Sequence, residues 1–358
     1  MKSEYTLGPY SRVLARFLTF VNMPVDKFVE MAKENPKRAE DIVLGWLLIH
    51  KRRFEEKKIS GSTIKNLRAP IRLLLEMNDV TGINWKKIAR IMPTARRYAL
   101  DRAPTISEIR ALIAAGDVRE RCAVLFMVSG GIRLGAWNYL KVGHVTPVRR
   151  ADGTVAGRMV VYANEPEQYE TFITPEAYDA LTAYLDFRKQ EGEKVTPDSP
   201  VMRNAFGIVG RALIPVSRVE PMYSGGVKNM MLRLFRKAGL RREKKRRHEF
   251  SLDHGFRKFY KTRCENVMKP INIELLMGHS TGISDSYYRP TEKELLDDYL
   301  NAVPLLTVSE VEEVRRESQL SRGQLEGRLQ QLENLVSKLV AQKGEQVLAL
   351  DRTRKSGT

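Results

Sequence analysis

Apolar residues recur every three or four positions over most of residues 1–92, a periodicity that predicts amphipathic helices. The pattern is clearest in four stretches: Val13 to Val21, Val25 to Lys33, Ala39 to Arg53 and Ser62 to Met77. Asn35-Pro36 and Ser60-Gly61-Ser62 separate these stretches, and we expect Ser62 to cap the fourth helix. Pro70 predicts a kink or a break within that helix, because proline has no backbone N–H. The first part of the chain is therefore expected to be all-helical.

The fourth stretch also carries basic residues outside its apolar stripe. Ile64, Leu67 and Ile71 form the stripe, whereas Lys65 and Arg68 fall on other faces of the helix. Given the basic character of the whole chain, we interpret Lys65 and Arg68 as contacts to DNA phosphates. The alternative is an ordinary solvated helix surface.

The pattern changes after a linker. Residues 93–104, PTARRYALDRAP, are basic and show no periodicity, and then Thr105 and Glu108 stand three apart as in a capping box. From Arg158 the runs RMVVYA and YETFIT are rich in β-branched and aromatic residues, and the polar turn 164–168 between them indicates a β-hairpin. The sequence thus predicts a mainly α protein with a small antiparallel β-sheet.

Charge narrows the class of partner. The 358-residue chain has a formal net charge of +18 and a pI near 9.8, which favours a polyanion such as nucleic acid or an anionic membrane surface. No apolar run approaches the roughly 20 residues that span a bilayer, and the N-terminus has no apolar signal core. Cys122 and Cys264 lie in apolar helical contexts, so we expect buried free thiols rather than a disulfide or a metal site. We predict a cytoplasmic, nucleoid-associated protein that binds DNA and no membrane.

Residues 252–290 carry the densest set of chemically active side chains. His254 and Arg257 stand three apart on a predicted helix, so both side chains face one anion-sized site. A second predicted helix ends at Gly278-His279, and a polar turn leads from there to Tyr287-Tyr288, where we expect a mobile, exposed hydroxyl. Each signal alone also fits an ordinary surface residue.

Arg133 is a second candidate for anion binding. It follows the break Ser129-Gly130-Gly131 and is expected to open a new helix, where backbone N–H groups and the guanidinium would point toward one oxyanion. The alternative is a surface arginine that caps a helix.

A basic run immediately precedes the segment that leads to His254. It spans residues 241–247 and contains a single acidic residue, Glu243. We interpret it as a contact surface for the DNA backbone, the alternative being a solvated face. The basic side chains concerned are Arg241, Arg242, Lys244, Lys245, Arg246 and Arg247.

Together, Ser129-Gly130-Gly131-Ile132-Arg133, His254-x-x-Arg257, Met277-Gly278-His279 and Tyr288 resemble the motifs of the tyrosine recombinases, the phage-integrase family. Tyr288 follows His279 by nine positions, the usual step in the family, which favours it over Tyr287. The likeness covers roughly Ala103 to Val303, and FITPEAYDAL and DSYYRPTEKELL look most like archaeal integrases, which are encoded by proviruses and plasmids. It implies a helical core-binding domain (1–92) that clamps DNA, a catalytic α+β domain (105–303) and a tail (304–358).

The resemblance also implies a chemistry. Tyr288 would attack a DNA phosphorus and leave a 3′-phosphotyrosine, with His254 as the base. Arg133 and Arg257 would neutralise charge on the phosphate oxygens, and His279 would donate a hydrogen bond to the same phosphate. No metal, cofactor or ATP is expected.

Two positions depart from the family pattern. The hairpin lysine that protonates the leaving oxygen is missing, since the sequence has no lysine between Lys141 and Lys189. Lys141 and Arg158 are distant substitutes, and water is another. Ala136 stands where the family usually has an acid that braces the first arginine.

Three functions remain open. A site-specific DNA recombinase is the main one, and a type IB topoisomerase or a recombinase-derived DNA-binding protein without cleavage are the alternatives. For a recombinase, the helix expected at Glu292 to Ala302, ended by Pro304, would dock on a neighbouring subunit in a tetramer on DNA. Further along, a short heptad-like pattern runs through Leu325, Leu329, Leu332, Val336 and Leu339.

Overall fold

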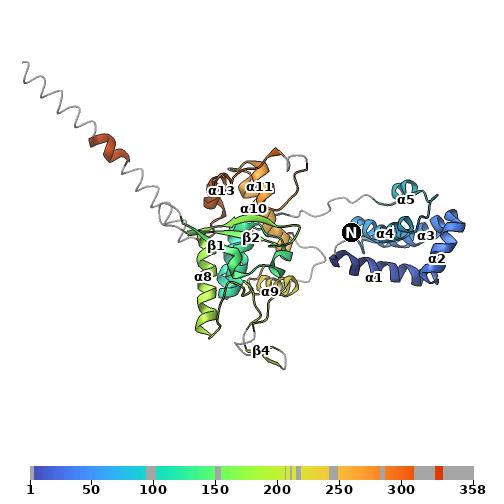
Figure 1. Ribbon diagram of the computed structural model, residues 1–358, viewed down its shortest axis with the longest axis horizontal. Helices are drawn as coiled ribbons and strands as arrows, with labels where there is room; N and C mark the ends of the chain where they lie inside the picture. The colour runs from blue at the N-terminus through green and yellow to red at the C-terminus, as the bar shows by residue number, and fades with distance from the viewer. Residues whose placement is uncertain are drawn as a thin grey trace, which may run out of the picture. The chain divides into compact units, whose positions relative to one another are not determined.

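The computed structural model divides the chain into two compact units, Met1–Ala99 and Leu100–Thr358, and each is described by itself (Figure 1). The division falls within the stretch 93–104 that the sequence indicates as a linker. The structure describes residues 4–93, 102–149, 155–205, 207–209, 212–214, 219–241, 249–282, 287–309 and 327–333.

The first unit is helical throughout its regular structure. Its helices are α1 (Glu4–Val21), α2 (Val25–Glu34), α3 (Pro36–Glu55), α4 (Gly61–Met77) and α5 (Trp85–Ile91). An aromatic cluster lies at the core, where the Phe17 ring packs edge-on against Phe28 and Trp46 with centroids 5.2 and 5.3 Å apart. The sequence did not indicate α5, because its seven residues are too short to establish a periodic pattern.

One local prediction for α4 was wrong, and of the kink or break predicted at Pro70 the break does not occur. Ser60, not Ser62, caps the helix, because the Ser60 hydroxyl accepts from the Thr63 N–H at 3.3 Å. Pro70 does not break the helix, which continues to Met77. Pro70 itself is buried, and packing of the apolar stripe Ile64, Leu67 and Ile71 against the core compensates for the hydrogen bond that proline cannot make.

The second unit combines helices with a small sheet. Strands β1 (Val145–Arg149), β2 (Val155–Val161) and β3 (Tyr169–Ile173) form an antiparallel sheet in that order, and β4 (Gly207–Val209) pairs with β5 (Ala212–Ile214). The helices are α6 (Ile106–Ala115), α7 (Val118–Gly130), α8 (Pro175–Gln190), α9 (Ser224–Lys237), α10 (Leu252–Cys264), α11 (Pro270–Leu276) and α13 (Glu292–Leu306). The predicted mainly α fold with a small antiparallel sheet is confirmed, and so is the β2–β3 hairpin. Strand β1 was not predicted, since it is short and contains Pro147, which an edge strand tolerates.

Helix α7 is the central element of this unit. Every residue from Cys122 to Gly130 is buried, and α6, α8, α10 and strand β3 pack around the helix (Figure 1). A helix that is apolar on all sides is characteristic of the centre of a domain. Cys122 and Cys264 are buried free thiols, as predicted, and burial raises the pKa of both.

An ionic cluster ties the segment after α8 to that helix. The guanidinium groups of Arg188 and Arg203, both fully buried, share the carboxylate of Glu193, with Arg188 Nε at 3.0 Å and Arg203 Nη1 at 2.7 Å from Oε2. Arg188 also donates to the carbonyl oxygens of Pro200 and Val201. Burial works against ionisation of Glu193, but the hydrogen bonds from the two arginines outweigh it and lower the pKa of the carboxyl.

Helix α13 docks on its own chain beside α10 (Figure 1). Tyr299, Ala302 and Leu306 on this helix are buried, and the Tyr299 hydroxyl donates to the carbonyl oxygen of Ser129 at 3.0 Å. The helix extends beyond the predicted end, because Pro304 lies within its last turn, where its missing N–H costs one hydrogen bond at most.

Among the described residues, no helix is long and apolar enough to cross a membrane. Of the predicted heptad pattern, residues 327–333 are helical, with Leu329 and Leu332 exposed. Leu325, Val336 and Leu339 lie outside the described residues.

Candidate active site

The C-terminal end of α7 positions the first arginine. Gly131 adopts a left-handed conformation (φ +56°), and a Cβ placed there would lie 2.6 Å from the Tyr260 ring, so only glycine fits this turn. Two residues later, Arg133 has an extended backbone and precedes a short 3₁₀ helix, η1 (Leu134–Asn138). Arg133 therefore follows the glycine break as predicted, although the segment that it opens is a 3₁₀ helix.

The second arginine reaches the same place from α10. The Arg257 side chain is buried (5% exposed) and donates to the carbonyl oxygens of Gly131 and, at 3.2 Å, Met277. Arg133 Nη2 donates to the carbonyl oxygen of Gly278 at 2.8 Å. Both arginines are thus held against the single turn that follows α11. Burial lowers the pKa of Arg257, and the neighbouring charge of Arg133 adds to this effect.

His279 completes this group from the same turn. Its Nε2 lies 2.7 Å from Nη2 of Arg257, and its Nδ1 bonds to the carboxylate of Glu274, which also pairs with the ammonium group of Lys261. Because a guanidinium only donates, we assign Nε2 as the acceptor and place the ring proton on Nδ1. Burial disfavours the charged form of Glu274, but the bonds from Lys261 and His279 prevail and lower its pKa.

Sequence reasoning missed Glu274 and Lys261, although both had a usable signal. Lys261 stands four residues after Arg257 and therefore on the same face of α10. Glu274 lies on α11, five residues before His279, and is the one charged residue in the sequence of this helix.

His254 lies one helical turn before Arg257, near the start of α10. The His254 side chain is exposed, whereas the Arg257 side chain is buried. On adjacent turns of α10, the imidazole therefore lies at the surface and the guanidinium lies inside the protein.

Tyr288 differs from the expectation of a mobile, exposed hydroxyl. The Tyr288 O–H donates to Oδ1 of Asn272 at 2.8 Å, and Asn272, which is 1% exposed, donates through Nδ2 to Asp298 on α13 at 2.7 Å. By contrast, the neighbouring Tyr287 is 85% exposed. The sequence offered no indication of this contact, because it joins residues that only the packing of α11 and α13 brings together.

Tyr288 and the arginines contact opposite ends of α11. Asn272 is in the first turn of this helix, whereas Met277, an acceptor of Arg257, follows its last turn. A rise of 1.5 Å per residue separates these two positions by about 7.5 Å along the axis. The structure therefore brings Arg133, Arg257 and His279 together and holds the Tyr288 hydroxyl on a separate partner.

The β2–β3 hairpin contributes tyrosines rather than a lysine. Tyr162 and Tyr169 border the hairpin turn with ring centroids 6.2 Å apart, and the Tyr169 ring covers Gly278, where a Cβ would clash with it. The Tyr169 hydroxyl is buried near Arg257 and Arg133; burial raises its pKa to about 12, although the two arginines act in the opposite direction.

The distant substitutes for the missing lysine are engaged elsewhere. Lys141 pairs with Asp198 at 2.9 Å, and Arg158 pairs with Glu170 and, at 3.2 Å, with Glu292. Ala136 is buried in η1, and Arg133 is braced by a backbone carbonyl instead of a carboxylate.

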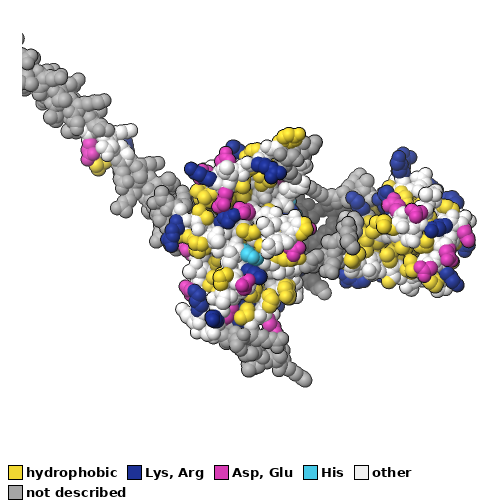
Figure 2. All heavy atoms as spheres, viewed as in Figure 1, with side chains coloured by type: hydrophobic (Ala, Val, Ile, Leu, Met, Phe, Trp, Pro, Cys, Tyr) yellow, Lys and Arg dark blue, Asp and Glu magenta, His cyan; other side chains and the backbone are white. Residues whose placement is uncertain are grey.

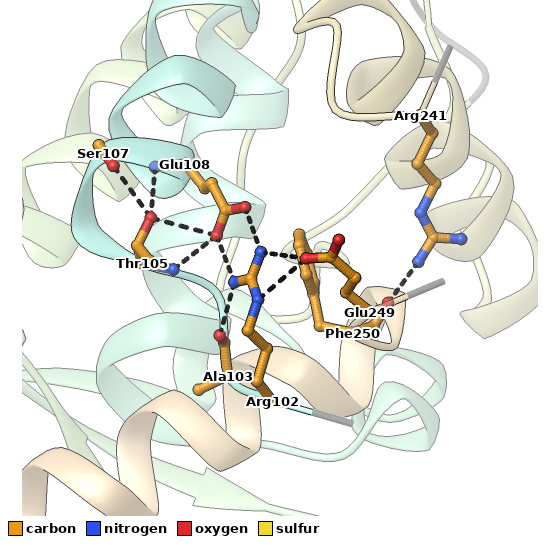
Figure 3. A network of polar contacts seen from close by, with 8 residues as sticks. All are labelled: Arg102, Ala103, Thr105, Ser107, Glu108, Arg241, Glu249 and Phe250. Atoms are coloured by element: carbon orange, nitrogen blue, oxygen red, sulfur yellow. Dashed lines mark hydrogen bonds and ion pairs between the residues drawn. The ribbon is translucent and has the colours of Figure 1, made fainter. Parts of the chain in front are cut away.

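The structure describes only some of the residues that were predicted to contact DNA. Lys65 is exposed and Arg68 half-buried on α4, and Arg242, Lys244, Lys245, Arg246 and Arg247 lie outside the described residues. Arg241 donates to the carbonyl oxygen of Phe250 at 2.8 Å (Figure 3). Its guanidinium also lies over the Phe235 ring, so part of this side chain serves the fold. On the face shown in Figure 2, Lys and Arg side chains lie among acidic and apolar ones rather than in one patch.

Arg102 holds the residues that precede α10 in place. Its guanidinium bonds both carboxylate oxygens of Glu108 at 2.7 Å and also bonds Glu249, while Thr105 and Glu108 form the predicted capping box of α6 (Figure 3). The residues just before α10 are thereby tied to the start of α6. This contact was not predicted, because Glu249 is remote from Arg102 in the sequence.

No protein-family model matches the sequence, and a search of curated proteins finds no relative. Among solved structures, the chain is similar to the XerA recombinase (19% identity, 84% of this chain and 92% of that chain covered, TM-score 0.39). It is also similar to the Tn1549 transposon integrase in complex with transposon right end DNA (17% identity, 72% and 84% covered, TM-score 0.45). A third match is a lambda integrase tetramer bound to a Holliday junction (16% identity, 81% and 73% covered, TM-score 0.46).

Proposed function

We propose that this protein is a tyrosine site-specific recombinase, which cleaves and rejoins DNA through a 3′-phosphotyrosine. One observation carries the proposal: Arg133, Arg257 and His279 come from three separate segments and meet around the turn Met277-Gly278-His279. Burying a guanidinium is unfavourable unless its charge is used, and Arg257 is fixed in place chiefly by neutral carbonyl groups. A group of fixed cations beside an imidazole is suited to a DNA phosphate.

The reaction follows from these positions. The two guanidiniums would bind the non-bridging oxygens of one phosphate and neutralise the charge that grows on them in the transition state, the largest contribution in such reactions. The Tyr288 oxygen would attack phosphorus, its proton passing to His254, and the 5′-oxygen of the next nucleotide would leave. The phosphotyrosine retains the energy of the broken bond, so a 5′-hydroxyl of a second strand reverses the step without ATP.

Tyr288 must exchange its partner before it attacks. Its hydroxyl bonds to Asn272, at the opposite end of α11 from the arginines. The Tyr288 side chain would therefore leave Asn272 when DNA binds, and its hydroxyl would turn to the phosphate. The contact with Asn272 would then be the resting position of the Tyr288 side chain, and the reaction would take place from another position.

DNA binding and assembly belong to the same proposal. The helical unit 1–92 would hold the duplex through Lys65 and Arg68, and the basic run 241–247 would contact the backbone beside the site. Strand exchange requires four active sites, so the chain would form a tetramer on two target sites.

A suicide substrate tests the proposal. A nicked duplex loses its 5′-hydroxyl strand after cleavage and therefore traps protein on DNA, which a denaturing gel separates from free protein. We expect an adduct with the wild type and with Tyr287→Phe, the matched control, and none with Tyr288→Phe at unchanged DNA affinity. Without an adduct for the wild type, the chain would instead be a DNA-binding protein that does not cleave. An adduct without strand exchange between two duplexes would indicate a topoisomerase.

A further inference from the structure

The leaving 5′-oxygen needs a proton, and the residues that the structure describes offer few donors near the arginines. An alkoxide is a poor leaving group, so a positioned acid accelerates such a step by about 10²- to 10⁴-fold. The hairpin loop 162–168 contains no lysine, and Lys141 and Arg158 are held by carboxylates elsewhere. Among the described residues, Tyr169 lies against Gly278, and Lys261 and His279 both bond to Glu274; all three side chains have a transferable proton.

Two of these groups are poorly placed. The Tyr169 hydroxyl is covered by protein, so it does not reach a leaving oxygen, and a phenol with a pKa of about 12 gives up its proton reluctantly. Lys261 lies on the far side of Glu274 from His279 and pairs with that carboxylate, which raises the pKa of Lys261.

His279 meets the geometric requirements. Its side chain is about one-third exposed, and its Nε2 is 2.7 Å from the Arg257 nitrogen that would bind the phosphate. Its Nδ1 donates to Glu274, and a carboxylate on that nitrogen fixes the ring and stabilises the imidazolium that forms when Nε2 gains a proton. Imidazole is also the side chain that ordinarily exchanges protons near neutral pH.

We propose that His279, oriented by Glu274, is the general acid that protonates the leaving 5′-oxygen in place of a hairpin lysine. The inference rests on the proposed function and adds a role to the hydrogen bond that the family resemblance assigns to this residue. In the step, the bond from Tyr288 oxygen to phosphorus forms while the bond from phosphorus to the 5′-oxygen breaks. The Tyr288 proton passes to His254, and the proton on Nε2 of His279 passes to the 5′-oxygen, which leaves as a hydroxyl. In rejoining, neutral His279 takes that proton back.

The charged groups around His279 couple this step to DNA binding. Glu274 faces Nδ1, Arg257 faces Nε2, Lys261 lies behind Glu274, and Arg133 is bonded to the adjacent Gly278. In the structure Arg257 donates to Nε2, so this nitrogen carries no proton. A bound phosphate would accept from Arg257 in its place and add negative charge, which favours protonation of Nε2.

A duplex with sulfur at the bridging 5′ position tests this role, because a thiolate leaves without a proton. His279→Gln keeps an N–H for the phosphate but has no acidic proton. We expect this variant to cleave the oxygen substrate about 10²- to 10⁴-fold more slowly than the wild type, and the sulfur substrate within about 10-fold of it. Arg133→Ala is the matched control, since loss of phosphate binding slows cleavage of both substrates.

Glu274→Gln tests the orienting carboxylate. Without its charge the imidazolium is less favoured, so the alkaline limb of the cleavage–pH profile on the oxygen substrate should move to lower pH. The profile on the sulfur substrate should not move. A merely structural role of Glu274 would not produce this difference between the two substrates. Equal slowing of His279→Gln on both substrates would overturn the inference. It would also be overturned if Lys244→Ala or Lys245→Ala, and not His279→Gln, were slow on the oxygen substrate and restored by the sulfur substrate. If the wild type forms no adduct even with the sulfur substrate, the proposed function itself fails.

Discussion

The hydroxyl of Tyr288 donates a 2.8 Å hydrogen bond to the side-chain oxygen of Asn272. The amide of Asn272 is fixed in that orientation, because its NH₂ group donates to Asp298, which also accepts from the Lys269 N–H at 3.0 Å. An amide oxygen accepts the phenol hydrogen but is no base, so the contact holds the Tyr288 side chain in one place. Since this place lies at the far end of α11 from Met277, the proposed attack requires that the contact break first.

Asn272→Ala should therefore increase the rate of single-turnover cleavage. The net contribution of one such hydrogen bond is about 0.5–1.5 kcal/mol, which corresponds to a roughly 2- to 10-fold faster adduct formation at saturating suicide substrate. Asp298→Asn, which disturbs the orientation of the amide but leaves it in place, should give a smaller change. Slower cleavage by Asn272→Ala with normal DNA affinity would mean that Asn272 supports the attack.

Glu193→Gln should destabilise the second unit strongly. The substitution leaves Arg188 and Arg203 buried without a counter-charge, a change that costs about 3–5 kcal/mol. Glu191→Gln, at an exposed position nearby, is the control and should lie within about 0.5 kcal/mol of the wild type. Urea unfolding followed by circular dichroism measures both.

The same carboxylate makes stability depend on pH. The folded state holds the pKa of Glu193 below its unfolded value, so its contribution is complete above the unfolded pKa and declines as pH falls through the folded one. Acidification should thus narrow the stability difference between wild type and Glu193→Gln. A difference that is constant from neutral to acidic pH would indicate that the cluster is held by packing and not by charge.

DNA affinity should fall steeply with salt. If about six phosphates are contacted, counterion release predicts a loss of roughly three orders of magnitude between low and moderate ionic strength. Replacing Arg242, Lys244 and Lys245 together by alanine should reduce the slope of log affinity against log salt by about 3. Arg241 is left out of this set because it bonds to Phe250 within the fold. An unchanged slope would mean that the basic run is a solvated surface.

The packed part of the second unit includes Val308 and Ser309, which sets where the tail can be removed. The backbone N–H groups of Val308 and Ser309 donate to Glu176 at 2.8 Å, and Leu306 and Val308 are fully buried. A stop after Ser309 should leave adduct formation intact. A stop after Val303 removes both buried side chains and should cost about 3 kcal/mol or more. Equal thermal stability of the two truncated proteins would show that this segment does not support the core.

Local sequence signals predicted much of the fold, and they named Arg133, Arg257 and His279, which the structure brings together. The alternation in RMVVYA and YETFIT depends only on neighbouring residues. So does the glycine break before Arg133, where the left-handed turn requires Gly131. The His279-to-Tyr288 spacing is likewise local. These features are set by backbone conformation and side-chain period, which a single sequence displays.

Contacts between distant segments could not be predicted in this way. Glu274 meets His279 and Lys261, and Asn272 meets Tyr288 and Asp298, because α10, α11 and α13 pack together. Arg102 joins Glu249 for the same reason. The local errors also have tertiary causes: burial keeps α4 intact through Pro70, and the packing of Leu306 extends α13 past Pro304.

Mass spectrometry of the trapped adduct tests the central claim most directly. Wild-type protein reacted with the suicide substrate is digested with a protease and a nuclease, and the peptide that retains a nucleotide is sequenced by fragmentation. Our account predicts one modified residue, Tyr288, carrying a 3′-phosphonucleotide, and its absence when Arg257 is replaced by lysine, which lacks the planar fork that binds two phosphate oxygens. A nucleotide on Tyr287, or on any residue other than Tyr288, would contradict it.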